Sequence, residues 1–161
     1  MSTPTQVRDY IQILEASTRP AKLETTPLPY GEKDLDPVER FQLLIRTHVL
    51  MSRDHKKEVK IFFLDEEHLS PEGIEINKQF QRDVLNIYRR ELQNLKAKGY
   101  LQYENLTALA LNILGVINWH LRWYRPEGPI SLEKIGEEIL TFIMYGVMGR
   151  SSLVKTEAPS T

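Results

Sequence analysis

LTALALNILGVINWHLRW, residues 106–123, is the stretch that decides the fold of this chain, and Asn105 before it is a suitable helix N-cap. One side of this helix is apolar at each helical repeat, through Leu106, Leu109, Ala110, Ile113, Leu114, Ile117 and Leu121. The roughly opposite side carries Ala108, Leu111, Gly115, Trp119 and Trp123. A helix that is apolar on two sides must be buried on two sides. A domain of this size has little room for a fully central helix, so the pattern indicates a partner subunit against the second side.

Two helices upstream have clear start signals. Asp36-Pro37-Val38-Glu39 combines an N-cap, a first-turn proline and a capping box, and the pattern predicts a helix that runs to about Ser52. Ser70-Pro71 opens the longest helix, at about 71–98, and Gly99 is suited to end it in a left-handed conformation. The apolar stripe of this long helix consists of Phe80, Val84, Ile87, Tyr88, Leu92 and Leu95.

Periodicity predicts three other helices. One covers about 55–67 and the last about 132–149, each with its apolar residues gathered on one side. In the last helix, Gly136 and Gly146 would let another backbone come close, at some cost in helix propensity. The third helix, about 4–17, is short and would be marginal on its own.

The chain divides into three segments. Residues 1–34 hold the short helix and a linker that is rich in proline, residues 35–149 form the predicted helical domain, and the polar tail 150–161 is expected to be disordered. No strand pattern and no internal repeat is visible. The predicted fold class is therefore all-α, a single helical-bundle domain of five to six helices.

Composition excludes several kinds of site. The formal net charge of −1 offers nothing to attract nucleic acid or an anionic membrane as a whole. The absence of cysteine removes disulfides, thiolate nucleophiles and cysteine-based metal sites. No apolar run approaches the ~18 residues of a membrane span, and the polar start carries no signal-peptide core, so we expect a cytoplasmic protein.

The interior is either a filled core or a ligand pocket, because both give the same pattern of apolar residues in the sequence. Its expected walls are Phe41, Phe62, Phe63, Phe80, Val84, Tyr88, Ile113 and Ile117. His48 and His120 fall on the same apolar faces. Each is either a hydrogen-bonded core histidine or one of the few polar groups that a pocket places among apolar walls.

Other polar residues give weaker signals. Asp65 and His68 are three residues apart, a spacing similar to the Glu-x-x-His motif of di-iron bundles. Such a bundle needs two copies of the motif. We therefore interpret the two residues as a solvated helix end and expect no metal and no cofactor. A basic cluster at Arg53, His55, Lys56, Lys57 and Lys60 is a solvated face, a site for an anionic head group or a contact to DNA. The DNA alternative is the weakest, because no groove-reading element accompanies the cluster. No catalytic triad, phosphate loop or H-E-x-x-H motif is present, so the sequence does not predict an enzyme.

One stretch resembles a known family. GVINWHLRWYRPEGPIS, residues 115–131, is similar to the end of TetR-family regulators of fatty-acid and steroid breakdown, where a G-x-x-N-W-x-x-x-W-Y-R-P pattern joins the last two helices. EHLSPE, residues 67–72, resembles the entry into their long central helix, and Gly99-Tyr100 resembles a break in the same proteins. The resemblance covers roughly residues 35–149.

The resemblance implies a dimer and a ligand. In that family the last two helices pair with those of a second subunit in a four-helix bundle. The implied interface residues are Leu111, Gly115, Trp119, Trp123, Gly136, Ile139, Ile143 and Gly146. The family also favours a pocket for a small apolar-tailed molecule such as an acyl-coenzyme A. Its phosphates would pair with Arg122 and Arg125, unless these arginines form surface ion pairs instead. Residues 1–34 do not resemble the helix-turn-helix head through which such regulators bind DNA.

Three hypotheses remain open. The first is the homodimeric effector-binding domain of a TetR-type repressor, without membrane contact and with DNA bound only through a helix-turn-helix head. The second is a dimerisation or interaction module that needs no ligand. The third is a small helical enzyme, for which the sequence assembles no site. A cavity of about 300 Å³ or more favours the first over the second.

Overall fold

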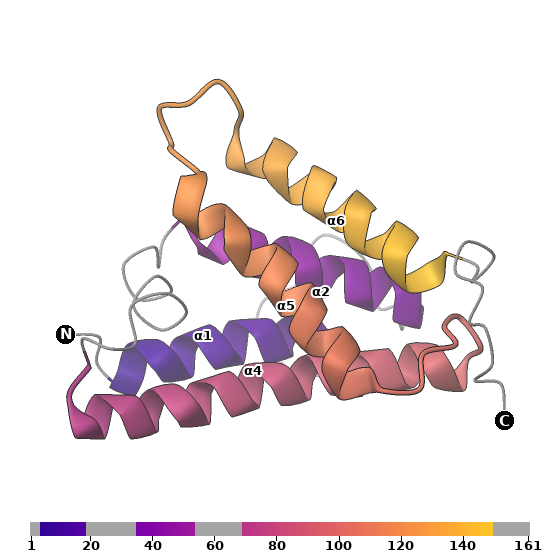
Figure 1. Cartoon of the computed structure of the whole chain (residues 1–161), viewed down its shortest axis with the longest axis horizontal. Helices are drawn as coiled ribbons and strands as arrows, with labels where there is room; N and C mark the ends of the chain where they lie inside the picture. Colours follow the sequence, from indigo (N-terminus) through magenta and orange to yellow (C-terminus); the bar gives the residue numbers. More distant parts are fainter. Residues whose placement is uncertain (1–3, 19–34, 54–68, 150–161) are drawn as a thin grey trace, which may run out of the picture.

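The computed structural model describes residues 4–18, 35–53 and 69–149 (Figure 1). These residues form five helices and no strand: α1 (Pro4–Thr18), α2 (Pro37–Met51), α4 (Pro71–Ala97), α5 (Leu106–Trp123) and α6 (Leu132–Met148). The all-α prediction is therefore confirmed. The helix predicted at 55–67, the proline-rich linker at 19–34 and the tail from 150 lie outside the described residues.

The helix starts follow from the capping residues. Asp36 accepts a hydrogen bond from the Val38 backbone N–H at 3.1 Å, while Glu39 accepts from the Asp36 N–H at 3.2 Å, which completes the predicted capping box of α2. Ser70, Asn105 and Ser131 cap α4, α5 and α6 in the same side-chain-to-backbone manner. Gly99 follows α4 with φ at +77°, the left-handed conformation expected there.

The helices form one core. In Figure 1, α1 and α4 run side by side, α5 crosses over them, and α6 lies beyond it. α1 packs on both α2 and α4, and α6 packs mainly on α2. From α1, Tyr10 is 3% exposed and Leu14 is fully buried. The short helix that would be marginal on its own thus lies inside the same core.

Helix α5 separates its two apolar sides as predicted. The first side lies in the core, where Leu109, Ala110, Ile113, Leu114, Ile117 and Leu121 are at most 7% exposed. The second side faces outward in this single chain. Burying a large apolar side chain contributes about 1.5–3 kcal/mol. The first side therefore attaches α5 to the bundle, while the second contributes nothing to the folding of a lone subunit.

Ion pairs hold the remaining helices together. Glu91 of α4 is 2% exposed and accepts from Arg40 of α2 at 3.2 Å and from Arg90 at 3.3 Å. Arg90 in turn donates to the Thr18 hydroxyl at the end of α1. This cluster of Thr18, Arg40, Arg90 and Glu91, here called the Glu91 cluster, therefore connects three helices.

Exposed ion pairs connect α6 to the α2 region. Arg46 bonds Glu137 through two nitrogens, at 2.7 and 3.1 Å, and Arg53 pairs with Glu133. The guanidinium of each arginine lowers the pKa of its glutamate. α6 is thus fixed by one side, and its other side is left free for further contacts.

Candidate functional site

The predicted interior residues converge in the structure. Eight of the ten predicted ligand-binding residues are described, and all are buried: Phe41, His48, Phe80, Val84, Tyr88, Ile113, Ile117 and His120. They come from α2, α4 and α5, which are far apart in the sequence. Phe62 and Phe63 lie outside the described residues. The structure also adds Tyr10 of α1, whose ring lies 5.2 Å from that of Phe80 and 5.8 Å from that of His48.

A buried polar pair lies at the centre of these residues. The Nδ1 atom of His48 is 2.8 Å from the Tyr88 hydroxyl. Burial lowers the pKa of His48 to about 3, and the nearby His120 adds to the shift. Burial likewise raises the pKa of the Tyr88 hydroxyl. Both groups are therefore neutral at physiological pH, so they act as hydrogen-bonding groups and not as charges.

A second polar group lies close by. The Nε2 atom of His120 is 2.9 Å from the Ser52 hydroxyl, which also contacts the Val49 carbonyl at 2.7 Å. The Nδ1 atom of His120 faces the Ile117 carbonyl. Burial lowers the pKa of His120, and the Ile117 carbonyl partly offsets this effect. Neutral His120 donates its Nδ1–H to the Ile117 carbonyl, which leaves Nε2 as an acceptor, so the single Ser52 hydroxyl proton serves either Nε2 or the Val49 carbonyl.

Sequence reasoning missed a buried amide. Asn77 of α4 is fully buried, and neither its Nδ2 nor its Oδ1 atom finds a hydrogen-bond partner among the described residues. It precedes Phe80 by one turn on the apolar stripe of α4. A buried amide without a partner costs about 1–3 kcal/mol, so Asn77 marks a place where an added polar atom would be stabilised. Its position one helical turn before Phe80, on the apolar stripe of the same helix, is the sequence feature that could have indicated its burial.

The second side of α5 continues into an exposed apolar face on α6. Its members, here called the α5–α6 face, are Leu111, Trp119, Trp123, Phe142 and Tyr145, each between 50% and 78% exposed. Gly115 and Gly146 leave open space where a Cβ would stand. Arg122 lies over the Trp119 ring at 5.8 Å. Phe142 and Tyr145 were not among the predicted interface residues, although they follow the same helical periodicity.

Three other predicted interface residues lie elsewhere. Gly136 is buried, and a Cβ built there would lie 3.5 Å from Cγ1 of Val49, which belongs to α2 of the same chain. Ile143 is 3% exposed within the core, and Ile139 is partly buried against it. These residues attach α6 to its own bundle, so the face available to a partner is formed by the exposed residues.

The remaining sequence candidates lie on the surface or outside the described residues. Arg122 and Arg125 are exposed, and Asp65, His68 and most of the basic cluster lie outside the described residues. Within residues 4–18, 35–53 and 69–149, no three histidine or carboxylate side chains gather as metal ligands. None of the helices found there is long and apolar enough to cross a membrane.

Comparison with known proteins identifies the family. The family described as "Tetracyclin repressor-like, C-terminal domain" matches residues 34–147. The chain belongs to this family. It is thus the ligand-binding and dimerisation domain of a TetR-type regulator, a non-enzymatic class, as the resemblance at residues 115–131 predicted. No curated protein matches the chain significantly.

Solved TetR-type regulators share the fold. A TetR/AcrR-family transcriptional regulator from Thermobifida fusca is 24% identical, with a TM-score of 0.66 over 89% of this chain and 71% of its own. The ketosteroid transcriptional regulator KstR2 of Mycobacterium tuberculosis is 19% identical, with a TM-score of 0.68 over 91% of this chain and 71% of its own. AibR, solved with isovaleryl coenzyme A and operator DNA, is 17% identical, with a TM-score of 0.58 over 89% of this chain and 75% of its own.

Proposed function

We propose that this TetR-type domain forms a homodimer through the α5–α6 face and binds a small apolar-tailed effector among the buried residues around His48 and Tyr88. Phe142 and Tyr145 are 66% and 78% exposed, which is unusual for aromatic side chains on the surface of a monomer. A second copy of the same face would cover them in a symmetric interface. The exposed glycines Gly115 and Gly146 would allow the helices to approach closely.

The buried Asn77 amide carries the effector proposal. Its Nδ2 and Oδ1 atoms have no partner among the described residues, and they lie one turn from Phe80 in an apolar interior. A few polar groups among apolar walls are typical of small-molecule sites. His48 and Tyr88 supply further neutral groups. We propose an acyl-coenzyme A as the effector class, supported by the isovaleryl coenzyme A that is bound to the distantly similar AibR.

The effector would act by shifting a population of conformers. α1 packs on α2 and α4 beside the proposed site, because Tyr10 lies against His48 and Phe80. A ligand that enters between these rings must move Tyr10, and with it α1. In a cytoplasmic regulator that carries a DNA-binding head before α1, this movement would change the spacing of two paired heads on DNA.

One observation favours a second candidate, a dimerisation module that needs no ligand. The Tyr10 ring fills the space between His48 and Phe80, as a packed core would. In this case the chain would pair with itself or with a full-length regulator through the α5–α6 face and bind no effector. The same experiment separates the two functions.

Native mass spectrometry of the purified chain, with and without a panel of acyl-coenzyme A compounds, tests the proposal. We expect a dimer that gains one ligand per subunit. Trp119→Glu should give monomers, whereas Leu43→Glu, which changes a 39% exposed leucine of α2, should remain dimeric. Asn77→Leu should weaken acyl-coenzyme A binding without changing the dimer. A dimer that binds no compound favours the second candidate, and a monomeric parent chain contradicts both.

A further inference from the structure

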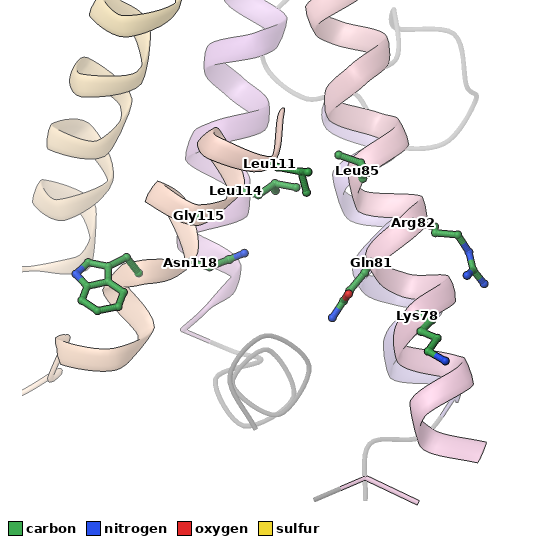
Figure 2. A pocket seen from close by; sticks show the side chains of 9 residues that line it. Lys78, Gln81, Arg82, Leu85, Leu111, Leu114, Gly115 and Asn118 are labelled. Atoms are coloured by element: carbon green, nitrogen blue, oxygen red, sulfur yellow. The ribbon is translucent and has the colours of Figure 1, made fainter. Parts of the chain in front are cut away.

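Two further features adjoin the α5–α6 face. On the side of α4, Leu111, Gly115 and Trp119 of the face also line a pocket of about 510 Å³, with Asn118 beside them (Figure 2). A second copy that covers the face would also cover this pocket, which therefore belongs to the same surface. The second feature is Tyr103, in the loop between α4 and α5, whose hydroxyl reaches α6.

Tyr103 connects the α4–α5 loop to the last turn of α6. Its hydroxyl donates to the backbone carbonyl of Gly146 at 2.7 Å. Helix α6 ends at Met148, so this carbonyl lies in the last turn, where the helix itself provides no N–H partner four residues further on. The tyrosine hydroxyl therefore takes the place of the missing donor.

The loop that carries Tyr103 is itself held in place. Lys96, in the last turn of α4, donates from its Nζ atom to the Tyr103 carbonyl at 2.8 Å. Leu101 is 4% exposed and packs in the core. Asn105 caps α5 by accepting from the Ala108 N–H at 3.0 Å. The position of Tyr103 is therefore set by the two helices that the loop joins.

The two halves of α6 are attached differently. The first two turns form ion pairs with arginines from outside the helix, through Glu133 and Glu137. In the second half, the core holds the inner side through residues such as Val147, which is 3% exposed. The only side-chain hydrogen bond that reaches this half from another described segment is that of Tyr103. Because Gly146 also lowers the helix propensity there, the last turn is prone to fray without this bond.

We propose that Tyr103 is a positioning residue for self-association, an inference that rests on the proposed dimer. Its hydroxyl keeps the last turn of α6 helical, so that Tyr145, next to Gly146, is held on the α5–α6 face. A frayed turn would have to be ordered each time a second copy binds, which costs conformational entropy. A symmetric interface contains the turn twice, so this cost is counted twice.

Tyr103→Phe tests the proposal, because it removes only the hydroxyl. We expect the dissociation constant of the dimer to rise about tenfold, as measured by analytical ultracentrifugation. Tyr100→Phe is the matched control and should leave the dissociation constant unchanged, since the Tyr100 hydroxyl bonds no other described residue. The two tyrosines lie in the same loop and are 42% and 41% exposed, so neither change threatens folding.

Backbone ¹³Cα chemical shifts, which report helical population, locate the effect. They are compared in the monomeric Trp119→Glu background, so that a change in dimerisation does not contribute. Adding Tyr103→Phe should move the shifts of Tyr145 and Gly146 toward unfolded values. The shift of Ile135, in the first turn of the same helix, should stay the same.

The possible results separate this inference from the proposed function. A parent chain that is monomeric contradicts the proposed dimer, and this inference with it. A dimeric parent chain that Tyr103→Phe does not weaken, or that Tyr100→Phe weakens equally, overturns the role of Tyr103 alone. A weaker dimer with unchanged ¹³Cα shifts also overturns this role, because the Tyr103 hydroxyl would then contact the second copy directly.

Discussion

The Nδ1 atom of His48 and the hydroxyl oxygen of Tyr88 lie 2.8 Å apart in a core that excludes both side chains from solvent. Burial lowers the pKa of His48 to about 3. In the unfolded chain a histidine titrates near 6.5. Between these values the unfolded chain binds a proton that the folded chain does not. The free energy of unfolding therefore falls as the pH drops below 6.5, and this contribution is fully present only above that pH.

His48→Gln should reduce the acid sensitivity of the domain. From pH 7 to pH 5 the buried histidine is expected to cost about 2 kcal/mol of stability, and glutamine should remove that cost while keeping a polar partner for Tyr88. The measurement is urea unfolding of both proteins at pH 7, 6 and 5. Tyr88→Phe is the control, because it removes the hydrogen bond but keeps the titrating group, so its pH slope should stay. An unchanged slope in His48→Gln contradicts the assignment.

Leu14→Ala should destabilise the domain by about 2–5 kcal/mol, as expected for a buried leucine that leaves a cavity. Leu14 is fully buried, although its helix is short and would be marginal alone. Ile13→Ala in the same helix is the matched control, since Ile13 is 42% exposed and should change stability far less. Thermal unfolding of the two variants gives the comparison. Equal effects would mean that α1 is not held in the core in solution.

The contrast between α5 and α1 shows what the sequence could predict. The two sides of α5 follow from the periodicity of residues 106–123, which is local, so both sides were found. The role of α1 depends on rings of α2 and α4 that meet Tyr10 only in the folded chain. Gly136 illustrates the same limit. Its position in the helix does not tell whether Val49 of the same chain or a residue of a partner subunit packs against it.

Polar groups were harder to place than apolar ones. Asn77, Glu91 and Asn118 fall at core positions of their helices, yet no pattern in the sequence indicates which partner a buried polar group meets. Glu91 is bonded to arginines, whereas the Asn77 amide has no hydrogen bond from described residues. The pocket beside Asn118 depends on how α4 and α5 cross, which is a tertiary property. The resemblance to the TetR family located the motif around Asn118 but not this pocket.

Arg40→Leu should cost about 2 kcal/mol or more, because it leaves the Glu91 carboxylate buried with only the half-exposed Arg90 as a charged partner. Arg46→Leu breaks an exposed Arg–Glu pair on the same helix and should cost less than about 1 kcal/mol. Double-mutant cycles with Glu91→Gln and Glu137→Gln, measured by urea unfolding, isolate the two pair energies. A larger coupling in the Arg46–Glu137 pair would contradict the importance of the Glu91 cluster.

Gly115→Ala and Gly136→Ala should separate subunit stability from dimer affinity. Neither Cβ meets a clash within the chain, since the space at Gly115 is open and the nearest atom to Gly136 is Val49 Cγ1 at 3.5 Å. Each change should therefore favour the helix by about 0.5–1 kcal/mol. Only Gly115 lies on the α5–α6 face, where an added methyl group would push a closely packed partner helix away. We expect Gly115→Ala to raise the dimer dissociation constant about fivefold and Gly136→Ala to leave it unchanged, as measured by analytical ultracentrifugation. Equal dissociation constants for the two variants would mean that the partner does not approach α5 at Gly115.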